Sequence, residues 1–385
     1  MPGSDKTNEV REIMLAFAER TGLTALHRPP RRYLWTDAHA VCNFLSLYRQ
    51  SGEDRYRNLA IALIDQVHDT LGRHRADDRR KGWISGLDEK EGQAHPTAGG
   101  LRIGKRLPER RRDEPFDERL EWDRDGQYFH YLTKWMHALA RAGDVTGNTH
   151  YWRLAIELAK AAHRGFTNVR AASGSKCLAW KMSIDLSYAL VPSSGLHDAL
   201  DAFITYDELR RHSQHAAGDS VMPNLDVEIA EAAAMIEGQR WNTDDPLGIG
   251  GLLFDACRAI RLAVDDSRLV ERLLRAALES LEVFSRRMPL GLAAQHRLAF
   301  RELGLSIGLR ALAMLPAVTC RRRCQGGERI GEYLVSLATY APLAAIIETF
   351  WSAADSQRVP GWLDHLDINT VMLATSLVPD EFARV

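Results

Sequence analysis

Apolar residues recur along most of the chain at the three- and four-residue spacing of helices that bury one face. Alternating apolar and polar runs bounded by turns, which would predict strands, are scarce. In WTDAHAVCNFLSLY, Thr36 is the expected N-cap, and the apolar stripe consists of Val41, Cys42, Leu45 and Tyr48. The pattern therefore predicts a nearly all-α protein.

The predicted helices come in pairs. The short turn QSGE joins the first of them to DRYRNLAIALIDQVHDTL, so these two helices are expected to lie antiparallel. The same design returns in YFHYLTKWMHALARAGDVTGNTHYWRLAIELAKAA. Both copies place a glycine four residues before a tyrosine and an alanine four residues after it: Gly52, Tyr56 and Ala60, then Gly147, Tyr151 and Ala155. This weak internal repeat predicts an architecture of helical hairpins.

Less similar pairs follow along the rest of the chain. They are KCLAWKMSIDLSYAL with GLHDALDAFITYDELRRH, GIGGLLFDACRAIRLAV with SRLVERLLRAALESLEVF, and HRLAFRELGLSIGLRALAML with GEYLVSLATYAPLAAIIETFW. With helices near residues 5–20 and 225–238, the count is about twelve. Each pair of a closed ring presents different side chains to one centre, whereas an open solenoid needs capping repeats. The divergence of the pairs therefore favours a closed toroid, with one domain over residues 1–385.

The charges of the chain are balanced, with 50 Lys and Arg against 51 Asp and Glu. No net field is present to gather nucleic acid or an anionic membrane. The first residues, MPGSDKTNEVREIM, lack the apolar core of a secretory signal, and the run LVSLATYAPLAAII is expected to be too short to span a bilayer. These features predict a soluble cytoplasmic protein without a nucleic-acid or membrane partner, and they leave the oligomeric state open.

The five cysteines are an odd, scattered set, which does not suggest a disulfide framework. Cys320 and Cys324 in TCRRRCQGG could share one helix face, but the neighbouring sequence holds no His or Cys to complete a metal site. The sequence has no phosphate-binding loop, no G-x-S-x-G elbow and no H-E-x-x-H motif. We therefore expect neither a metal nor a cofactor.

The hairpin LYRQSGEDRYRNLAIALIDQV, its echo ALARAGDVTGNTHYWRLAIELA and the total length resemble the six-hairpin glycosidase superfamily. Members of this superfamily are (α/α)6 barrels, and they include unsaturated glucuronyl hydrolases, other glycosidases, and the N-acylglucosamine and cellobiose epimerases. As architecture, the resemblance covers most of the chain. It implies an all-α (α/α)6 barrel that acts on a carbohydrate.

The longest stretch without a helical pattern is a loop from about residue 74 to residue 125. Its many charges of both signs, together with Gly and Pro, are also typical of a disordered insertion. Apolar residues such as Trp83, Leu101 and Trp122 are nevertheless spaced through it, and a disordered linker would not need these anchors. Because functional side chains concentrate on the long loops of a rigid scaffold, we expect this loop to mark the mouth of the barrel.

Carboxylates cluster where this loop meets the next helix, in EWDRDGQYFHYLTKWMHAL. Asp125 is expected to cap that helix, but capping does not account for Asp123 or Glu121. A helix N-terminus keeps a carboxylate ionised, which suits a base or nucleophile. Glycoside hydrolysis also needs an opposed carboxyl group. Our first choice is Asp37 in WTDAH, which could equally be a first-turn acid that helps to cap its helix. The predicted catalytic residues are Asp123, Asp125 and Asp37.

Several tryptophans lie beside acids or at helix entries, outside the middle of apolar stripes. An indole offers an apolar face to the C–H side of a sugar and an N–H to a hydroxyl, although each indole alone could be ordinary core packing. Nearby polar groups could contact the same ligand, or be packed histidines and surface ion pairs. The predicted substrate-binding residues are Trp35, His39, Trp83, Glu121, Trp122, His130, Trp180, Lys181, Trp241, Arg301 and His365.

The sequence supports three functions. The first is a glycoside hydrolase that acts on a small saccharide or glycoside by carboxylate acid/base catalysis. The second is a sugar epimerase or isomerase of the N-acylglucosamine 2-epimerase type, in which two of His39, His130, His296 and His365 would be the acid and the base. The third is a non-catalytic helical toroid that binds a partner through its concave face.

Overall fold

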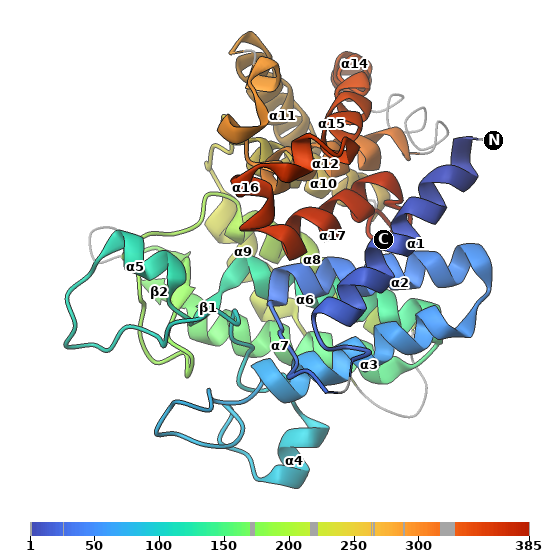
Figure 1. Cartoon of the computed structure of the whole chain (residues 1–385). Coiled ribbons are helices and arrows are strands. Elements are labelled where there is room, and N and C mark those ends of the chain that lie inside the picture. The colour runs from blue at the N-terminus through green and yellow to red at the C-terminus, as the bar shows by residue number, and fades with distance from the viewer. Residues whose placement is uncertain are drawn as a thin grey trace. The chain divides into compact units, whose positions relative to one another are not determined.

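The computed structural model describes residues 2–25, 27–169, 174–215, 222–262, 264, 266–287, 289–315 and 328–384. Helices predominate in these residues, and the strands are two or three residues long (Figure 1). The chain divides into two compact units. The central unit is Ala18–Glu237, and the terminal unit combines Met1–Phe17 with Gly238–Val385. The expectation of one domain over residues 1–385 stays a prediction.

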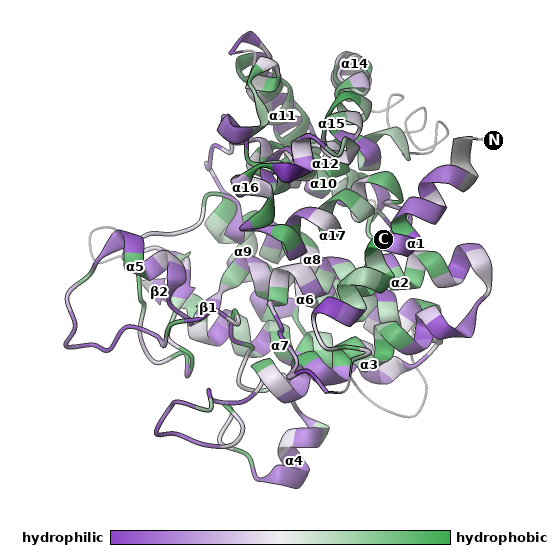
Figure 2. Cartoon of the chain, in the orientation of Figure 1, coloured by the Kyte–Doolittle hydropathy of each residue, from purple (hydrophilic) through white to green (hydrophobic). Residues whose placement is uncertain are grey.

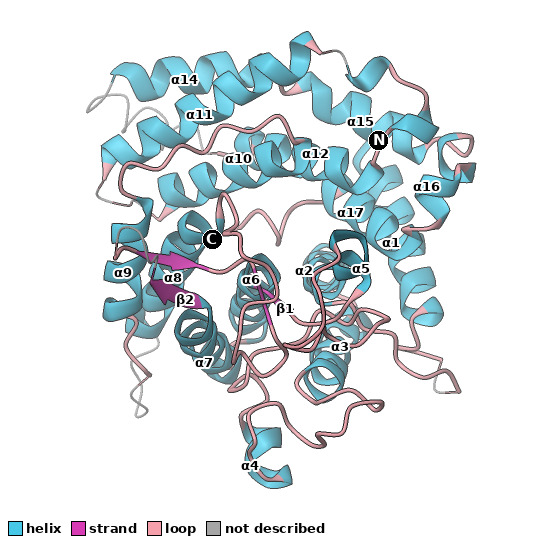
Figure 3. Ribbon diagram, turned by 90° about the vertical axis from the view of Figure 1, so that its left-hand side faces the viewer, coloured by secondary structure: helices cyan, strands magenta, loops and turns pink. Residues whose placement is uncertain are grey.

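Three long helices form the middle of the central unit. The helix α6 (Phe129–Thr146) packs against both α2 (Leu34–Ser51) and α8 (Asp198–His215), as Figure 3 shows. Each of the three packs against the next long helix along the chain. These partners are α3 (Asp54–Leu71), α7 (Thr149–Phe166) and α9 (Asp226–Ile236). The predicted helical hairpins are therefore present.

The glycines of the internal repeat end the first helix of each hairpin. Gly52 follows α2 with φ 71°, and Gly147 follows α6 with φ 69°. Both lie in the left-handed region, where a residue with a Cβ is strained, and both donate their backbone N–H to a carbonyl of the preceding turn. The repeat is thus explained locally. Each hairpin needs a left-handed glycine at the end of its first helix, where the chain turns back.

The strands hold the loop segments against the helices. The strand β1 (Gln127–Tyr128) pairs antiparallel with β4 (Lys181–Met182), and β2 (Thr167–Val169) pairs antiparallel with β3 (Lys176–Leu178). The helix predicted for KCLAWKMSIDLSYAL is therefore wrong. β4 forms its ladder with a segment more than fifty residues away, and spacing within one segment does not report such a partner.

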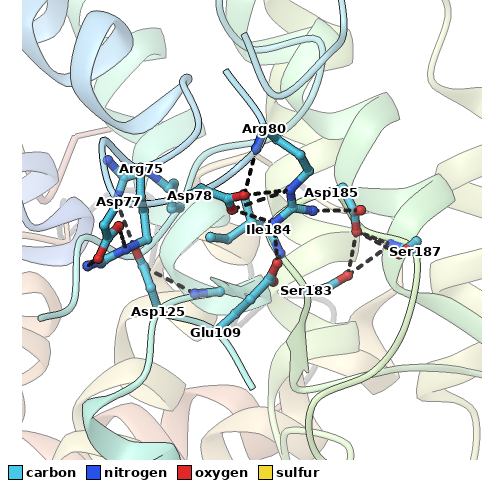
Figure 4. Close-up of polar contacts among 12 residues, drawn as sticks. Arg75, Asp77, Asp78, Arg80, Glu109, Asp125, Ser183, Ile184, Asp185 and Ser187 are labelled. Atoms are coloured by element: carbon cyan, nitrogen blue, oxygen red, sulfur yellow. Dashed lines mark hydrogen bonds and ion pairs between the residues drawn. The ribbon is translucent and has the colours of Figure 1, made fainter. Parts of the chain in front are cut away.

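The charged loop has a defined path over the central unit and contains two short helices, α4 (Glu89–Ala94) and α5 (Glu118–Asp123). Its residues are mostly hydrophilic (Figure 2), yet ion pairs attach it to the strand region. The guanidinium of Arg80 lies 2.7 Å from Asp78, 2.5 Å from Glu109 and 2.9 Å from Asp185 (Figure 4). Glu109 also accepts the backbone N–H of Ile184 at 2.5 Å. Because these bonds fix its position, the loop is ordered in the described residues, unlike a disordered insertion.

The terminal unit is also helical. The helix α10 (Pro246–Arg261) packs against α11 (Ser267–Arg286) and α12 (Ala299–Ala313). The latter packs against α15 (Pro342–Ser352) and α17 (Leu366–Leu377), and α11 packs against α14 (Glu328–Ala338). The remaining elements are α1 (Pro2–Arg20), α16 (Pro360–Leu363), and the 3₁₀ turns η1 (Pro289–Gly291), η2 (Ala294–His296) and η3 (Ser356–Arg358). α1 extends across the boundary between the units.

The segment predicted as one helix in GEYLVSLATYAPLAAIIETFW is two helices. α14 ends at Ala338 and α15 begins at Pro342, whose ring favours the first turn of a helix. By length and composition alone, Arg329–Ser352 is a 24-residue stretch apolar enough to cross a membrane. The apolar run LVSLATYAPLAAII lies within this longer stretch, and the expectation of no membrane partner stays a prediction.

Candidate functional site

The starts of α2, α6 and α8 meet in the central unit. Trp35 is the second residue of α2, His130 is the second residue of α6, and Asp198 is the first residue of α8. The ring centroids of Trp35 and His130 are 5.9 Å apart, and Nδ1 of His130 lies 3.9 Å from Oδ1 of Asp198. Three helices far apart in sequence thus place their first turns around one imidazole.

Aromatic rings surround His130. We call Trp35, Tyr128, His130, Tyr131 and Trp180 the aromatic cluster. The ring centroids of Tyr131, Tyr128 and Trp180 lie 4.8, 5.3 and 6.4 Å from that of His130, and the Trp180 ring is stacked on it. The side chain of His130 is 28% exposed, so part of this imidazole is accessible from solvent. Rings in this arrangement offer flat apolar faces for the C–H groups of a bound molecule.

Three residues at these helix starts have buried polar atoms that lack a hydrogen-bond partner among the described residues. They are Nε1 of Trp35, Nδ1 of His130 and Oδ2 of Asp198. Most buried polar groups in folded proteins are paired, and each exception calls for an explanation. An indole N–H, an imidazole nitrogen and a carboxyl oxygen are together suited to a ligand that carries hydroxyl groups.

Burial alters the proton affinities of this region. It lowers the pKa of His39 to about 3 and also lowers the pKa of His130, with the charge of Lys134 acting in the same direction for both. Burial and the neighbouring Asp201 raise the pKa of Asp198 to about 8. At neutral pH, the site therefore combines neutral imidazoles with a protonated carboxyl group, an arrangement suited to proton transfer.

Two lysines lie beside the cluster. Nζ of Lys181 is 5.4 Å and Nζ of Lys105 is 5.6 Å from the centroid of the Tyr128 ring. Lys181 is buried on β4, and its ammonium forms an ion pair of 2.8 Å with the Glu121 carboxylate. These two predicted binding residues are therefore partners of one another. Lys105 is half-buried and donates to the carbonyl of Trp122, whose 47% exposed ring lies 5.4 Å from Trp180. Trp122 thus extends the cluster toward solvent.

The predicted catalytic acids have different environments. Asp37 is buried, accepts the backbone N–H of Tyr33 at 2.8 Å and lies 3.4 Å from Arg32. Since Tyr33 is the N-cap position of α2, the expectation that Thr36 is the N-cap is wrong, and Asp37 reaches back to that position. Asp123, in contrast, is exposed at the end of α5.

Asp125 is fully buried and has several partners. It lies 2.6 Å from Arg102 and 3.4 Å from Arg75, and it accepts the backbone N–H groups of Gly104 and Gly126 at 3.0 and 3.1 Å. The N-cap position of α6 is Tyr128, so the expectation that Asp125 caps this helix is wrong. The intervening β1 displaces Asp125, and its carboxylate instead orients the loop.

Trp83 lies away from the aromatic cluster residues that it was expected to join. It lines a separate cavity of about 220 Å³ together with His68, His150 and Tyr151. Arg73 lies over the Trp83 ring at 3.9 Å. The structure thus gives Trp83 a different setting from Trp35, His39, His130 and Trp180, which lie together.

Three predicted binding residues belong to the terminal unit. Trp241 is buried, with Arg272 over its ring at 4.5 Å. Arg301 forms an ion pair of 2.8 Å with Asp245, and the His365 ring lies 5.7 Å from that of Phe300. Within this unit each of the three has an identified neighbour that accounts for its position.

Sequence reasoning missed four residues of the site: Lys105, Tyr128, Tyr131 and Asp198. For Asp198 a signal was present, because HDALDAF begins a predicted helix with an acid beside a histidine, as WTDAH does. Metal-ligating clusters of three or more His, Cys, Asp or Glu do not occur among the residues that the structure describes. Cys320 and Cys324 lie outside those residues.

The chain was compared with known proteins. No family model and no curated protein match it. Among solved structures, a glycoside hydrolase family 76 α-mannanase from Bacteroides thetaiotaomicron gives a TM-score of 0.56 at 9% identity, covering 98% of this chain and 96% of its own. A family 76 glycoside hydrolase from a bovine Bacteroides thetaiotaomicron strain gives 0.54 at 9% identity, covering 98% and 77%. A cellobiose 2-epimerase from Spirochaeta thermophila gives 0.46 at 12% identity, covering 86% and 84%.

The two family 76 structures show the fold of this chain. Both cover nearly all of it, with TM-scores above 0.5. The predicted all-α (α/α)6 fold class is confirmed, and so is the resemblance to the six-hairpin glycosidase superfamily at the level of fold.

Proposed function

We propose that this chain is a carbohydrate-active enzyme, a glycoside hydrolase that binds a small saccharide at the aromatic cluster. The observation that carries the proposal is the unpaired indole N–H, imidazole nitrogen and carboxyl oxygen of Trp35, His130 and Asp198, set among aromatic rings. A sugar presents both an apolar C–H face and hydroxyl groups, and it complements this combination. The fold shared with family 76 glycoside hydrolases supports the same class of substrate.

In this proposal, Trp180 stacks on one face of the sugar and Asp123 is the base that activates water. Asp123 is chosen because its carboxylate is exposed, whereas Asp37 and Asp125 accept bonds from backbone amides and lie beside arginines. We assign Asp37 and Asp125 the role of holding the first turn of α2 and the loop in position. Water and a proton donor on opposite sides of the glycosidic bond are the requirements of an inverting hydrolase.

The test is incubation with a panel of disaccharides and aryl glycosides, followed by detection of released sugar. Trp180→Ala should weaken saccharide binding roughly tenfold or more, because stacking on an aromatic ring is lost. Trp152→Ala is the matched control, since Trp152 is also half-buried in the central unit but stacks on His212, 5.4 Å away. Asp123→Asn should abolish sugar release and retain binding. No release from any substrate, with equal binding by all variants, would contradict the proposal.

A sugar epimerase is the second candidate function, and one observation favours it. The rings of His39 and His130 both lie against the Trp35 ring, with centroid distances of 5.1 and 5.9 Å. Two neutral histidines near one bound sugar are suited to removing and returning a proton at carbon. Exchange of deuterium at C2 of a free aldose, without cleavage of a glycosidic bond, would favour this function over hydrolysis.

A further inference from the structure

The carboxyl group of Asp198 packs closely against the backbone of Gly195. A backbone hydrogen bond from Gly195 acts on it, and a Cβ on Gly195 would lie only 2.2 Å from Oδ2. The side chain is 7% exposed, so its environment is protein and not solvent. Nδ1 of His130 is the imidazole nitrogen that faces this carboxyl group, at 3.9 Å from Oδ1.

The groups around this pair have bonds of their own. Asp201, one turn along α8, accepts the hydroxyl of Thr133 at 2.5 Å and Nζ of Lys134 at 2.8 Å. Further titratable side chains around the pair, among the described residues, are Lys105 on the loop, Tyr128 and Tyr131 next to His130, and His39 on α2, whose ring lies against Trp35. Asp201 thus has partners for its charge, whereas Oδ2 of Asp198 and Nδ1 of His130 have no hydrogen-bond partner among the described residues.

We propose that Asp198 and His130 form a proton-transfer pair, in which Asp198 supplies a proton to His130 while His130 protonates the leaving oxygen of the bound glycoside. This inference rests on the proposed hydrolase function. The separation of 3.9 Å exceeds a hydrogen bond, and catalytic contacts commonly tighten only when substrate is bound. Asp198 acts on the leaving oxygen only through the imidazole, so in this step it is a positioning residue and His130 is the catalytic residue.

The step balances as follows. The Nε2–H proton of His130 moves to the glycosidic oxygen as the bond from that oxygen to the anomeric carbon breaks, and the electron pair of this bond stays on the oxygen. The carboxyl proton of Asp198 moves from Oδ1, the oxygen 3.9 Å from the imidazole, to Nδ1, so the imidazole stays neutral. Water adds to the anomeric carbon and gives its proton to Asp123. To reset the site, solvent returns one proton to Nε2 of His130, the Nδ1 proton moves back to Asp198, and Asp123 gives its proton to solvent.

Electrostatics support this assignment. Because burial and the charge of Asp201 raise the pKa of Asp198 to about 8, the carboxyl group still holds its proton at neutral pH. Burial lowers the pKa of His130, so an isolated imidazole at this position would be a poor proton carrier above neutrality. A neighbouring carboxylic acid removes this difficulty by supplying a proton as the imidazole gives one up.

The first test does not depend on the substrate. In protein labelled with ¹⁵N-histidine, the His130 resonances are identified by their loss in His130→Gln, and they are followed from pH 6 to pH 10. We expect a change with a midpoint near pH 8 in the unaltered protein, caused by ionisation of Asp198, and its absence in Asp198→Asn. His130 resonances that stay constant, or an unchanged midpoint in Asp198→Asn, would overturn the pairing.

Two further variants serve as an independent check and as a control for this test. Gly195→Ala keeps the carboxyl group but displaces it, so the midpoint should shift even if Asp198→Asn does not fold. Asp207→Asn is the matched control, because Asp207 is a buried acid on the same helix that lies 2.9 Å from Arg211. A midpoint that is displaced in Asp207→Asn but not in Gly195→Ala would overturn the assignment.

The second test uses a cleaved glycoside. The value of kcat/KM should fall above about pH 8 in the unaltered enzyme, and in Asp198→Asn this fall should move to lower pH, with a loss of roughly tenfold or more at pH 7. An unchanged pH profile in Asp198→Asn would overturn the proton-transfer pair and leave the hydrolase function intact. Absence of cleavage, with the resonance midpoint present, would overturn the function and retain the pairing.

Discussion

Nζ of Lys181 lies 2.8 Å from Oε1 of Glu121, and their side chains are 0% and 5% exposed. The ammonium also donates to the carbonyls of Glu121 and Arg124, at 2.7 and 2.8 Å. This buried ion pair joins β4 to α5 across sixty residues of sequence, directly beside Tyr128 of the aromatic cluster. The loop is therefore held at the site by the buried ammonium of Lys181, whose charge the Glu121 carboxylate neutralises.

Lys181→Met should destabilise the protein strongly. Removing one partner leaves the Glu121 carboxylate and two carbonyls buried without their donor, and breaking a buried pair in this way costs about 3–5 kcal/mol. Urea unfolding measures the change. In the control variant Lys176→Met, the lost ion pair with Glu231 involves a 47% exposed side chain, and its loss should cost less than about 1 kcal/mol. Equal losses in the two variants would contradict the prediction.

Gly250→Ala should destabilise the terminal unit, because α10 and α12 approach each other closely there. A Cβ on Gly250 would lie 2.0 Å from the carbonyl oxygen of Gly304, and this backbone atom has no rotamer with which to move away. Overpacking of this kind costs about 1–3 kcal/mol or more, measurable by thermal unfolding. Gly251→Ala is the control, since no atom lies within 4 Å of its added Cβ. It should gain about 0.5–1 kcal/mol from the better helix propensity of alanine.

Lys105 should lose its positive charge near pH 8. Burial, followed by the like charge of Lys181, lowers its pKa from 10.5 to about 8, so the free amine forms more than two pH units below the pKa of an exposed lysine. Acetylation of Lys105, followed by mass spectrometry, should reach half of its maximal rate near pH 8. A lysine-containing peptide titrated in parallel provides the reference. Half-maximal labelling at the pH of the peptide would contradict the prediction.

Asp198→Asn should alter how stability depends on pH. The folded carboxyl group ionises at about pH 8 and the unfolded one near 3.8, so the folded state retains a proton in between. The contribution of Asp198 to stability therefore falls as pH rises through this range, by at most about 1.4 kcal/mol per unit for a single group. Because asparagine does not ionise, the free energy of unfolding of the variant should rise relative to that of the unaltered protein between pH 5 and pH 7. If the free energies of unfolding of the two proteins change in parallel between pH 5 and pH 7, the prediction is wrong.

The hairpins could be predicted from the sequence because their causes are local. The apolar stripe of α3 follows helical spacing, and Gly52 and Gly147 supply the left-handed residue that ends α2 and α6. Helix boundaries were less accurate. Asp37 and Asp125 were expected in the first turn or at the cap of their helices, and only Asp37 lies within the first residues of one.

The candidate site depended on contacts that no segment contains by itself. WTDAH, QYFH and HDAL each show a helix start with chemistry beside it, but only packing of α2, α6 and α8 brings Trp35, His130 and Asp198 together. The strand β4 likewise exists through its pairing with β1, which places Lys181 opposite Tyr128.

The sequence by itself therefore determined the helical hairpins and their turns, since spacing and left-handed glycines act within a few residues. Only the tertiary structure decided which acids are bonded to arginines, as Asp125 is, and which buried polar atoms lack a partner, as Oδ2 of Asp198 does. Those properties depend on distances between segments far apart along the chain, and burial and pairing across such distances determine the proton affinity of a side chain.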